Sequence, residues 1–145
     1  MLSSDMAIVY VEDDPLSCQV MQLMAEHILR ARNFTVFEDS TNIVSRIRAL
    51  DRRPDIIFLD IQIKPHDGYE MVQMIRQDPE LKKVKVVAIT ASVVAATDRL
   101  RACGFDGAIN KPVNPVTFPR LIERIVEGGQ IWDDDSEEWL NEHRG

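Results

Sequence analysis

The chain has 145 residues, a typical length for one domain, and its hydrophobic fraction of 45% is sufficient for a single core. No apolar run approaches the roughly 20 residues that span a bilayer, and the N-terminus lacks the basic segment of a signal peptide. The formal net charge is −7, but residues 128–145 hold six acids and one arginine, so the body is nearly neutral. We therefore expect a cytoplasmic protein whose partners include no nucleic acid and no membrane.

The first third of the chain alternates short apolar runs with longer amphipathic segments. Residues 6–11 predict a strand, and residues 35–37 predict a weaker one. Between them, a helix that begins at Pro15 carries apolar residues at helical spacing: Leu16, Val20, Leu23, Met24 and Ile28. Ser40 is the predicted N-cap of a second helix, whose apolar face is Ile43, Ile47 and Leu50.

The rest of the chain repeats the alternation. Further strands are predicted over 56–59, 84–89 and 108–110. Helices are predicted from Gly68 to the Asp78-Pro79 turn, over 93–103 with Gly104 as the C-terminal cap, and over 118–126. Strands that alternate with helices form a mostly parallel sheet covered on both faces. The expected fold class is therefore α/β, with a doubly wound five-stranded parallel sheet.

Beyond residue 127 the composition changes. We expect one domain over 1–127 and an acidic tail over 128–145, with a short helix near 136–143. Trp132 and Trp139 lie in this tail. They are expected to dock on the body or on a second copy of the chain, to dock on a foreign partner, or to be disordered, so a homodimer is left open.

Polar residues follow four of the predicted strands. Carboxylates come after the first strand and end the third, a hydroxyl ends the fourth and an ammonium group follows the fifth: Glu12, Asp13, Asp14, Asp60, Thr90 and Lys111. The carboxyl ends of parallel strands meet at one edge of the sheet, where ligands of such folds bind. We expect these side chains to share one crevice.

The chemistry of this set points to phosphoryl transfer. Clustered carboxylates repel one another unless a cation joins them, and oxygen ligands favour Mg²⁺, or Mn²⁺ in its place. Lys111 adds a positive charge and Thr90 a hydroxyl donor. With these groups around it, Asp60 is the candidate nucleophile.

Four motifs carry a family resemblance: V-E-D-D-P at 11–15, F-L-D-I-Q at 58–62 with D-G-Y-E at 67–70, A-I-T-A-S at 88–92 and F-D-G-A-I-N-K-P at 105–112. In this order and spacing, the sequence resembles the receiver domain of two-component response regulators over about residues 5–127. The resemblance implies a flavodoxin-like sheet with strand order 2-1-3-4-5.

The resemblance also implies roles for single residues. Asp60 matches the phospho-acceptor, Glu12 and Asp13 match the acidic pair that holds the metal, and the backbone carbonyl of Gln62 matches a further ligand. Thr90 matches the switch hydroxyl, and Lys111 matches the lysine that pairs with a phosphoryl oxygen and precedes a cis proline. Gln62 and Ser92 match the positions that tune the lifetime of the phosphorylated state.

Two departures from the family pattern stand out. The loop Ile63–His66 lacks the usual Met-Pro pair, and its proline is displaced to Pro65. The switch aromatic, three residues before the lysine, is replaced by Ala108. The first departure is either a neutral surface change or a change of partner surface or phosphoryl lifetime, and the second puts the usual output mechanism in question.

The expected function is that of a phosphorylation-switched response regulator. It would accept a phosphoryl group from a sensor histidine kinase or a histidine phosphotransfer protein, lose it to water, and signal by contact with an unknown downstream protein. No enzymatic activity is expected beyond these reactions at Asp60. Two alternatives are a phosphorylation-independent interaction module and an aspartyl-nucleophile phosphatase, which would have a second Asp where this chain has Gln62.

Overall fold

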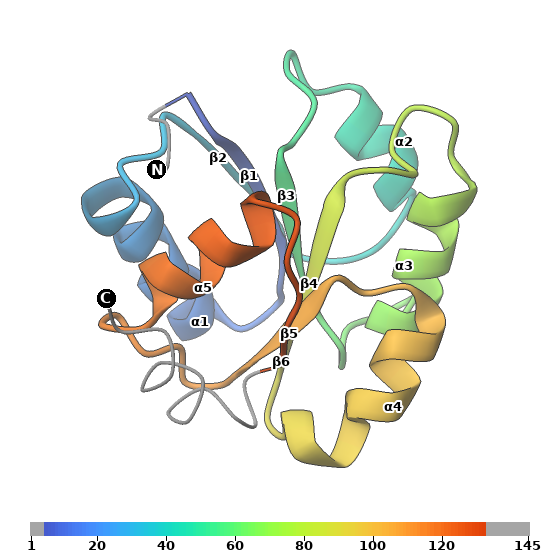
Figure 1. Cartoon of the computed structure of the whole chain (residues 1–145). Coiled ribbons are helices and arrows are strands. Elements are labelled where there is room, and N and C mark those ends of the chain that lie inside the picture. Colours follow the sequence, from blue (N-terminus) through green and yellow to red (C-terminus); the bar gives the residue numbers. More distant parts are fainter. Residues whose placement is uncertain (1–4, 133–145) are drawn as a thin grey trace.

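A computed structural model describes residues 5–132, and Figure 1 shows a single parallel sheet between two layers of helices. The sheet order is β2-β1-β3-β4-β5-β6, and every neighbouring pair is parallel. The strands are β1 (Ala7–Val11), β2 (Asn33–Phe37), β3 (Ile56–Asp60), β4 (Lys85–Thr90), β5 (Gly107–Asn110) and β6 (Ile131–Trp132). The helices are α1 (Pro15–Leu23), continued by the π-helical turn η1 (Met24–Ile28), α2 (Ile43–Arg48), α3 (Gly68–Gln77), α4 (Val93–Cys103) and α5 (Phe118–Val126).

The flavodoxin-like fold class is confirmed, with one addition. The first five strands have the predicted order, and β6 extends the sheet beyond β5 as a sixth, two-residue strand that the sequence pattern did not indicate. The predicted tail helix near 136–143 and Trp139 lie outside the described residues.

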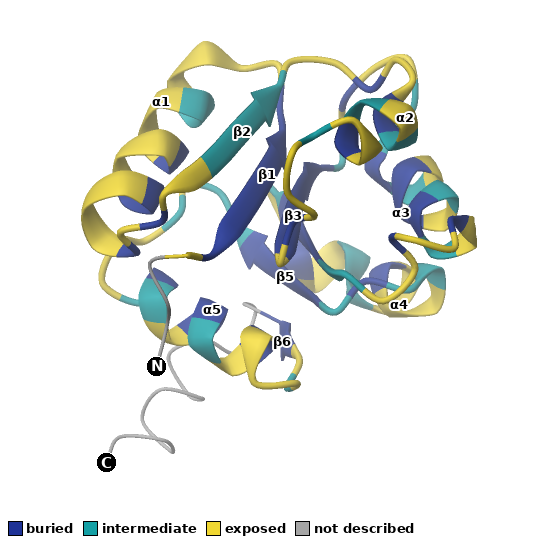
Figure 2. Cartoon of the chain, turned by 90° about the horizontal axis from the view of Figure 1, so that it is seen from above, coloured by how far each residue is buried: buried dark blue, intermediate teal, exposed yellow. Residues whose placement is uncertain are grey.

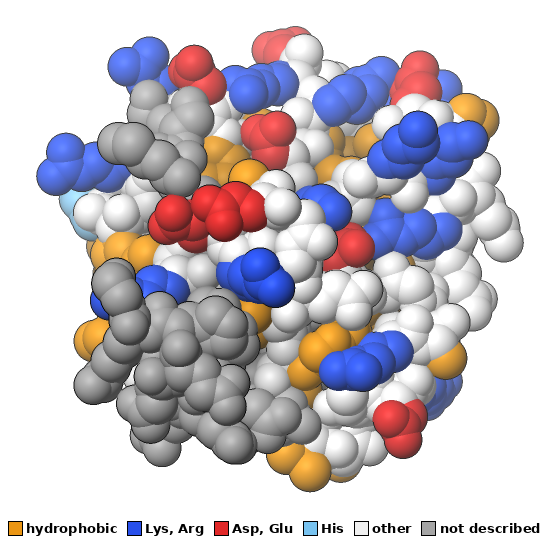
Figure 3. Space-filling view, viewed as in Figure 1, with side chains coloured by type: hydrophobic (Ala, Val, Ile, Leu, Met, Phe, Trp, Pro, Cys, Tyr) orange, Lys and Arg blue, Asp and Glu red, His pale blue; other side chains and the backbone are white. Residues whose placement is uncertain are grey.

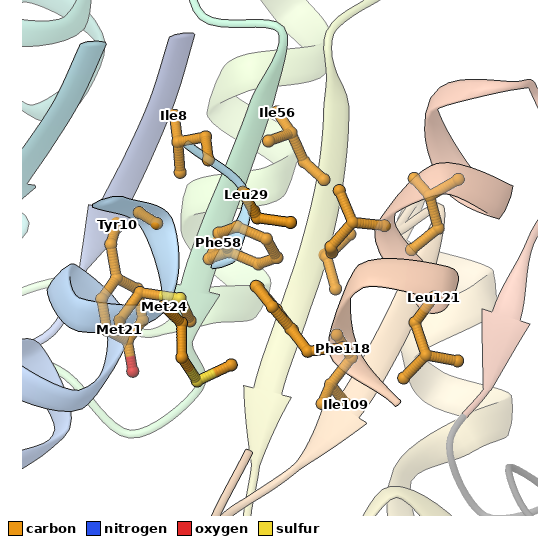
Figure 4. Packing of buried hydrophobic residues seen from close by; sticks show 14 of the residues in the cluster. Ile8, Tyr10, Met21, Met24, Leu29, Ile56, Phe58, Ile109, Phe118 and Leu121 are labelled. Atoms are coloured by element: carbon orange, nitrogen blue, oxygen red, sulfur yellow. The ribbon is translucent and has the colours of Figure 1, made fainter. Parts of the chain in front are cut away.

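The strands at the centre of the sheet are buried on both faces. All five residues of β1 and of β3 are buried, as their unbroken apolar runs predict (Figure 2). The helices α1 and α5 cover one face, and α2, α3 and α4 cover the other (Figure 1). Figure 4 shows the first of these layers, where the Phe58 ring lies between Tyr10 and Phe118 at centroid distances of 6.4 and 5.7 Å.

The predicted apolar face of the first helix is wrong. Only Met24 of the predicted set is buried, and four of its members are exposed: Leu16, Val20, Leu23 and Ile28. The helix instead packs on the sheet through Met21, Met24, Ala25 and Leu29. Apolar residues therefore lie on more than one face of this helix, and the sheet covers the face that carries Met21 and Ala25.

The predicted cap of the second helix is also wrong. Asn42 is the N-cap of α2, and its side chain makes no capping hydrogen bond. The Ser40 hydroxyl, fully buried, donates to the carbonyl oxygen of His66 (2.7 Å) and accepts from the backbone N–H of His66 (2.6 Å). Ser40 thus holds the loop that follows β3 rather than a helix end.

Charges are mixed on the face that carries β6. Figure 3 shows Lys and Arg side chains interspersed with Asp and Glu side chains over that face. Within residues 5–132, no helix combines the length and the apolar composition needed to cross a lipid bilayer.

Candidate functional site

Three carboxylates meet where β1 and β3 end. Asp60 is the last residue of β3, and Glu12 and Asp13 follow β1 directly. One ligand oxygen from each of the three lies within 4.8 Å of the other two. Strands β1 and β3 are neighbours in the sheet, so the parallel register alone brings these residues to one edge.

Glu12 is fully buried and holds its neighbours in place. Its Oε1 accepts hydrogen bonds from the Tyr10 hydroxyl (2.9 Å) and from Lys111 Nζ (2.5 Å). Its Oε2 accepts from the backbone N–H groups of Asp13 (3.1 Å) and Asp14 (3.3 Å). Burial raises the pKa of Glu12, but hydrogen bonds from Asp60, Lys111 and Tyr10 outweigh it and leave the pKa below its usual value.

Asp60 is 6% exposed, and its carboxylate lies beside both Glu12 and Lys111. Its Oδ1 accepts from the backbone N–H of Gln62 (3.2 Å), and its Oδ2 lies 3.6 Å from Lys111 Nζ. Burial, followed by the hydrogen bond and charge of Glu12, raises the pKa of Asp60 to about 7. Without a cation, this pocket therefore favours a proton on Asp60.

We expect the metal-free protein to lose stability as the pH rises from about 4 to about 7. Over this interval the folded state keeps a proton on Asp60 that the unfolded state has released, so the free energy of unfolding falls with increasing pH. Because one pKa unit corresponds to about 1.4 kcal/mol, the loss is at most about 4 kcal/mol over these three pH units, and the lowered pKa of Glu12 acts in the opposite direction. Urea denaturation in a chelating buffer at about pH 5 and about pH 8 measures it.

Asp60→Asn is the matched control, because a carboxamide of the same shape does not titrate. Its free energy of unfolding should change less over the same pH interval. Equal pH dependence in both proteins would show that the Asp60 carboxyl is not held in its neutral form.

Gly68 allows helix α3 to begin against the loop that follows β3. A Cβ at this position would lie 2.9 Å from Cα of Ile61, closer than real Cβ contacts, and at a tight 3.1 Å from the carbonyl oxygen of Asp60. Asp67 caps the same helix in a capping box with Glu70. The D-G-Y-E motif thus fixes the chain directly behind Asp60.

The other predicted residues lie along the same edge. Thr90 ends β4, one position beyond Ile89, the register partner of Asp60. Lys111 follows β5, and its peptide bond to Pro112 is cis, as the resemblance implies. Ser92 is the N-cap of α4, where its side chain accepts from the backbone N–H of Ala95 at 3.4 Å.

The structure locates both departures from the family pattern, Ala108 and the loop Ile63–His66. Ala108 is fully buried on the face that α4 covers. In the loop after β3, Ile63 is buried and Lys64 is exposed, and a second cis bond precedes Pro65. His66 Nδ1 lies 3.2 Å from Glu70 Oε2, so this histidine pairs within its own loop and helix.

Sequence reasoning missed Tyr10. Its hydroxyl is the one polar side-chain group in the apolar run of β1, and it reaches Glu12 two residues on. That isolated hydroxyl just before three acids was the available signal. Burial and the neighbouring carboxylates raise the pKa of Tyr10 far above its usual value, so it acts as a donor.

The donor set fits a hard divalent cation. It offers three carboxylates, of which Glu12 and Asp60 are buried and Asp13 is exposed, so an ion could keep waters on its open side. Lys111 lies beside the cluster as a compact positive charge. An acidic pocket with an adjacent ammonium group can hold Mg²⁺ together with an anionic oxygen group.

Comparisons with known proteins agree with this geometry. The profile of the response regulator receiver domain matches residues 8–125. The polar-differentiation response regulator DivK of Brucella anthropi is 28% identical over 120 residues, which are 82% of this chain and 92% of that protein. DivK of Brucella melitensis is 27% identical over 120 residues, again 82% of this chain and 92% of that protein.

Solved structures share the fold at lower identity. A two-component response regulator of the LuxR family from Aurantimonas has a TM-score of 0.76 at 21% identity and covers 95% of this chain and 96% of its own. The isolated receiver domain of RcsB from Salmonella enterica, in the presence of phosphomimetic BeF₃⁻, has a TM-score of 0.75 at 18% identity. The match covers 94% of this chain and 98% of that one. The receiver domain of a sensor histidine kinase from Pseudomonas aeruginosa, with a magnesium ion coordinated in its active site cleft, has a TM-score of 0.73 at 24% identity. The match covers 85% of this chain and 98% of that one.

Proposed function

The chain belongs to the response regulator receiver domain family, and we propose that it is a switch that accepts a phosphoryl group on Asp60. The phosphoryl chemistry is assigned to the receiver domain over residues 1–127. The observation that carries the proposal is the position of the buried Asp60 carboxylate, beside the carboxylates of Glu12 and Asp13 and the ammonium group of Lys111.

Asp60 is the nucleophile of the proposed reaction. Its Oδ2 attacks the phosphorus of a phosphohistidine, the phosphorus–nitrogen bond breaks, and the electron pair leaves with the imidazole. Glu12, Asp13 and Asp60, with the backbone carbonyl of Gln62, would hold Mg²⁺, which neutralises negative charge on the phosphoryl oxygens when bound. Hydrolysis by water returns Asp60 to its free carboxylate, at a rate set in part by Gln62 and Ser92.

Lys111 and Thr90 stabilise the phosphorylated state. Lys111 Nζ already lies 3.6 Å from Asp60 Oδ2, and it would exchange part of its pairing with Glu12 for a phosphoryl oxygen. Thr90, at the end of the neighbouring strand, would donate its hydroxyl to another phosphoryl oxygen. A phosphoryl group that bonds both residues better in one conformation shifts the population toward it.

The proposed donor is a protein, a sensor histidine kinase or a histidine phosphotransfer protein. The exposed stripe of α1 lies beside the cleft, where Leu16 and Val20 line a cavity of about 250 Å³ together with Lys111 and Pro112. An apolar surface next to a reactive carboxylate favours a docked protein over a free small anion. The downstream target is a further protein.

Incubation with acetyl phosphate and Mg²⁺, followed by intact-mass analysis, tests the proposal. We expect one phosphoryl adduct per chain in the presence of Mg²⁺ and none when the metal is chelated. The adduct forms because the activated phosphate supplies the same leaving-group chemistry as a phosphohistidine.

Rapid hydrolysis would hide the adduct, so the beryllofluoride complex with Mg²⁺ is the second readout. A bound beryllofluoride resonance in fluorine NMR would support an acceptor with a short-lived product. If neither the adduct nor this resonance appeared, the protein would be a phosphorylation-independent interaction module on a receiver scaffold.

A further inference from the structure

The short strand β6 places an aromatic ring beside Ala108, the position where the family's ring is missing. In the β5–β6 register, Ile131 pairs with Gly107 and Trp132 pairs with Ala108. Register partners on parallel strands direct their side chains to the same face of a sheet. Trp132 and Ala108 accordingly belong to the same buried cluster, under α4.

The close approach of β6 depends on Gly107. A Cβ at this position would lie 2.6 Å from the carbonyl oxygen of Ile131 and 3.2 Å from Cδ1 of Ile125. Both distances are shorter than ordinary contacts, and the first is to backbone. Any side chain at position 107 would therefore displace β6 from the edge of the sheet.

Trp132 is buried, but its indole N–H lacks a hydrogen-bond partner among the described residues. The residue is 9% exposed, and the guanidinium of Arg101 on α4 lies 4.8 Å from the centroid of its ring. Its Nε1 is buried and has no hydrogen-bond acceptor among the residues that the structure describes. Release of the ring into water would give this N–H a hydrogen-bond partner. The free energy gained in this way lowers the cost of undocking Trp132.

A continuous path connects this ring to the acceptor site. Across the sheet, Leu59, Ala88, Ala108 and Trp132 form one register row, which starts beside Asp60. The two small alanines fill little of the space next to the indole.

Helix α4 provides the second connection. It begins three residues after Thr90, and Asn110 Oδ1 accepts from the backbone N–H of Val93 (2.8 Å), so β4, β5 and the start of α4 are joined. Arg101, which stacks on Trp132, lies on the same helix. A shift of Thr90 would therefore reach the indole through one rigid element.

We propose that Trp132 couples the docking of β6 to the occupancy of Asp60, and that phosphorylation releases β6 from the α4–β5 face. Trp132 acts as a positioning residue in place of the ring that Ala108 lacks. A phosphoryl group draws Thr90 and the start of α4 toward Asp60, and Arg101 and its helix withdraw from the indole. The inference rests on the proposed function, because it requires an anion at Asp60. Release of β6 leaves the outer backbone edge of β5 without a paired strand.

Fluorescence of a Trp139→Phe variant tests the release. Trp132 is then the one tryptophan of the chain. We expect saturation with Mg²⁺ and beryllofluoride to shift its emission to longer wavelength, as the ring moves from a buried site into water. Fluorine NMR of the same sample reports independently whether beryllofluoride is bound.

Coupling is reciprocal, so loss of docking must strengthen binding of the anion. We expect Trp132→Ala and Gly107→Ala to bind beryllofluoride about 3- to 10-fold more tightly than Trp139→Phe does. Gly107→Ala retains the indole and displaces β6 by steric overlap, so it separates loss of docking from loss of the ring. A purely structural role of Trp132 would alter the melting temperature but not this affinity.

The outcomes distinguish failure of the coupling from failure of the proposed function. Bound beryllofluoride with an unchanged Trp132 emission, or with affinities of both variants within about twofold of Trp139→Phe, overturns the coupling and leaves the proposed function intact. Failure of the wild-type chain to bind beryllofluoride overturns the coupling, and failure to form the phosphoryl adduct as well overturns the proposed function.

Discussion

Replacement of Asp60 by Asn is expected to lower phosphoryl incorporation from acetyl phosphate by at least about 100-fold. The carboxamide keeps the size of the side chain but has no anionic oxygen to attack phosphorus. It also removes one of three carboxylates from the cluster with Glu12 and Asp13, so the metal is held less well. Intact-mass analysis of both proteins after the same incubation measures the effect.

Asp14→Asn is the matched control for this experiment. Asp14 lies in the same segment as Glu12 and Asp13, but its carboxylate accepts from the backbone N–H of Ser17 (3.0 Å) as the N-cap of α1. Asn caps helices as well as Asp, so this variant should fold and be labelled like the wild type. Treatment with hydroxylamine, which cleaves acyl phosphates, distinguishes a carboxylate adduct from one on Thr90 or Ser92. A full adduct in Asp60→Asn would place the acceptor elsewhere.

Sequence patterns predicted the elements that are determined by local composition. The apolar runs of β1 and β3 are strands buried on both faces, and the predicted bounds of α4 and α5 are those of the structure. In these segments the hydrophobic period, the caps and the burial all favour the same structure. The convergence of Glu12, Asp13 and Asp60 follows in turn, because parallel strands direct their carboxyl ends to one edge.

The errors arose where a distant residue decides the structure. The helix that begins at Pro15 carries apolar residues on more than one face, and only packing against the sheet leaves Leu16 and Leu23 exposed. Serine is a residue type typical of helix N-caps, but the Ser40 hydroxyl forms hydrogen bonds with the backbone of His66 instead. Strand β6 has two residues, too few for any period, and it depends on space left by Gly107.

Asp13→Asn is expected to weaken Mg²⁺ binding by at least about tenfold without loss of the fold. Asp13 is the exposed member of the acidic cluster, so its carboxylate supplies charge to the ion but supports no buried contact. Glu12, by contrast, also holds Tyr10 and Lys111, and its replacement would disturb the pocket itself. Calorimetric titration of the metal-free protein with Mg²⁺ measures the difference.

The comparison with Asp14→Asn makes this result specific. Both substitutions remove one negative charge from adjacent positions, so a general electrostatic attraction of Mg²⁺ to the acidic edge would be weakened equally by each. Direct ligation predicts instead that Asp13→Asn alone loses affinity, because Asp14 Oδ2 is occupied by the backbone and hydroxyl of Ser17 (3.0 and 2.6 Å). Equal affinities in the two variants would mean that Asp13 does not ligate the ion. In that case Glu12, Asp60 and the Gln62 carbonyl would have to hold it, and the open side of the site would be wider than the acidic triad implies.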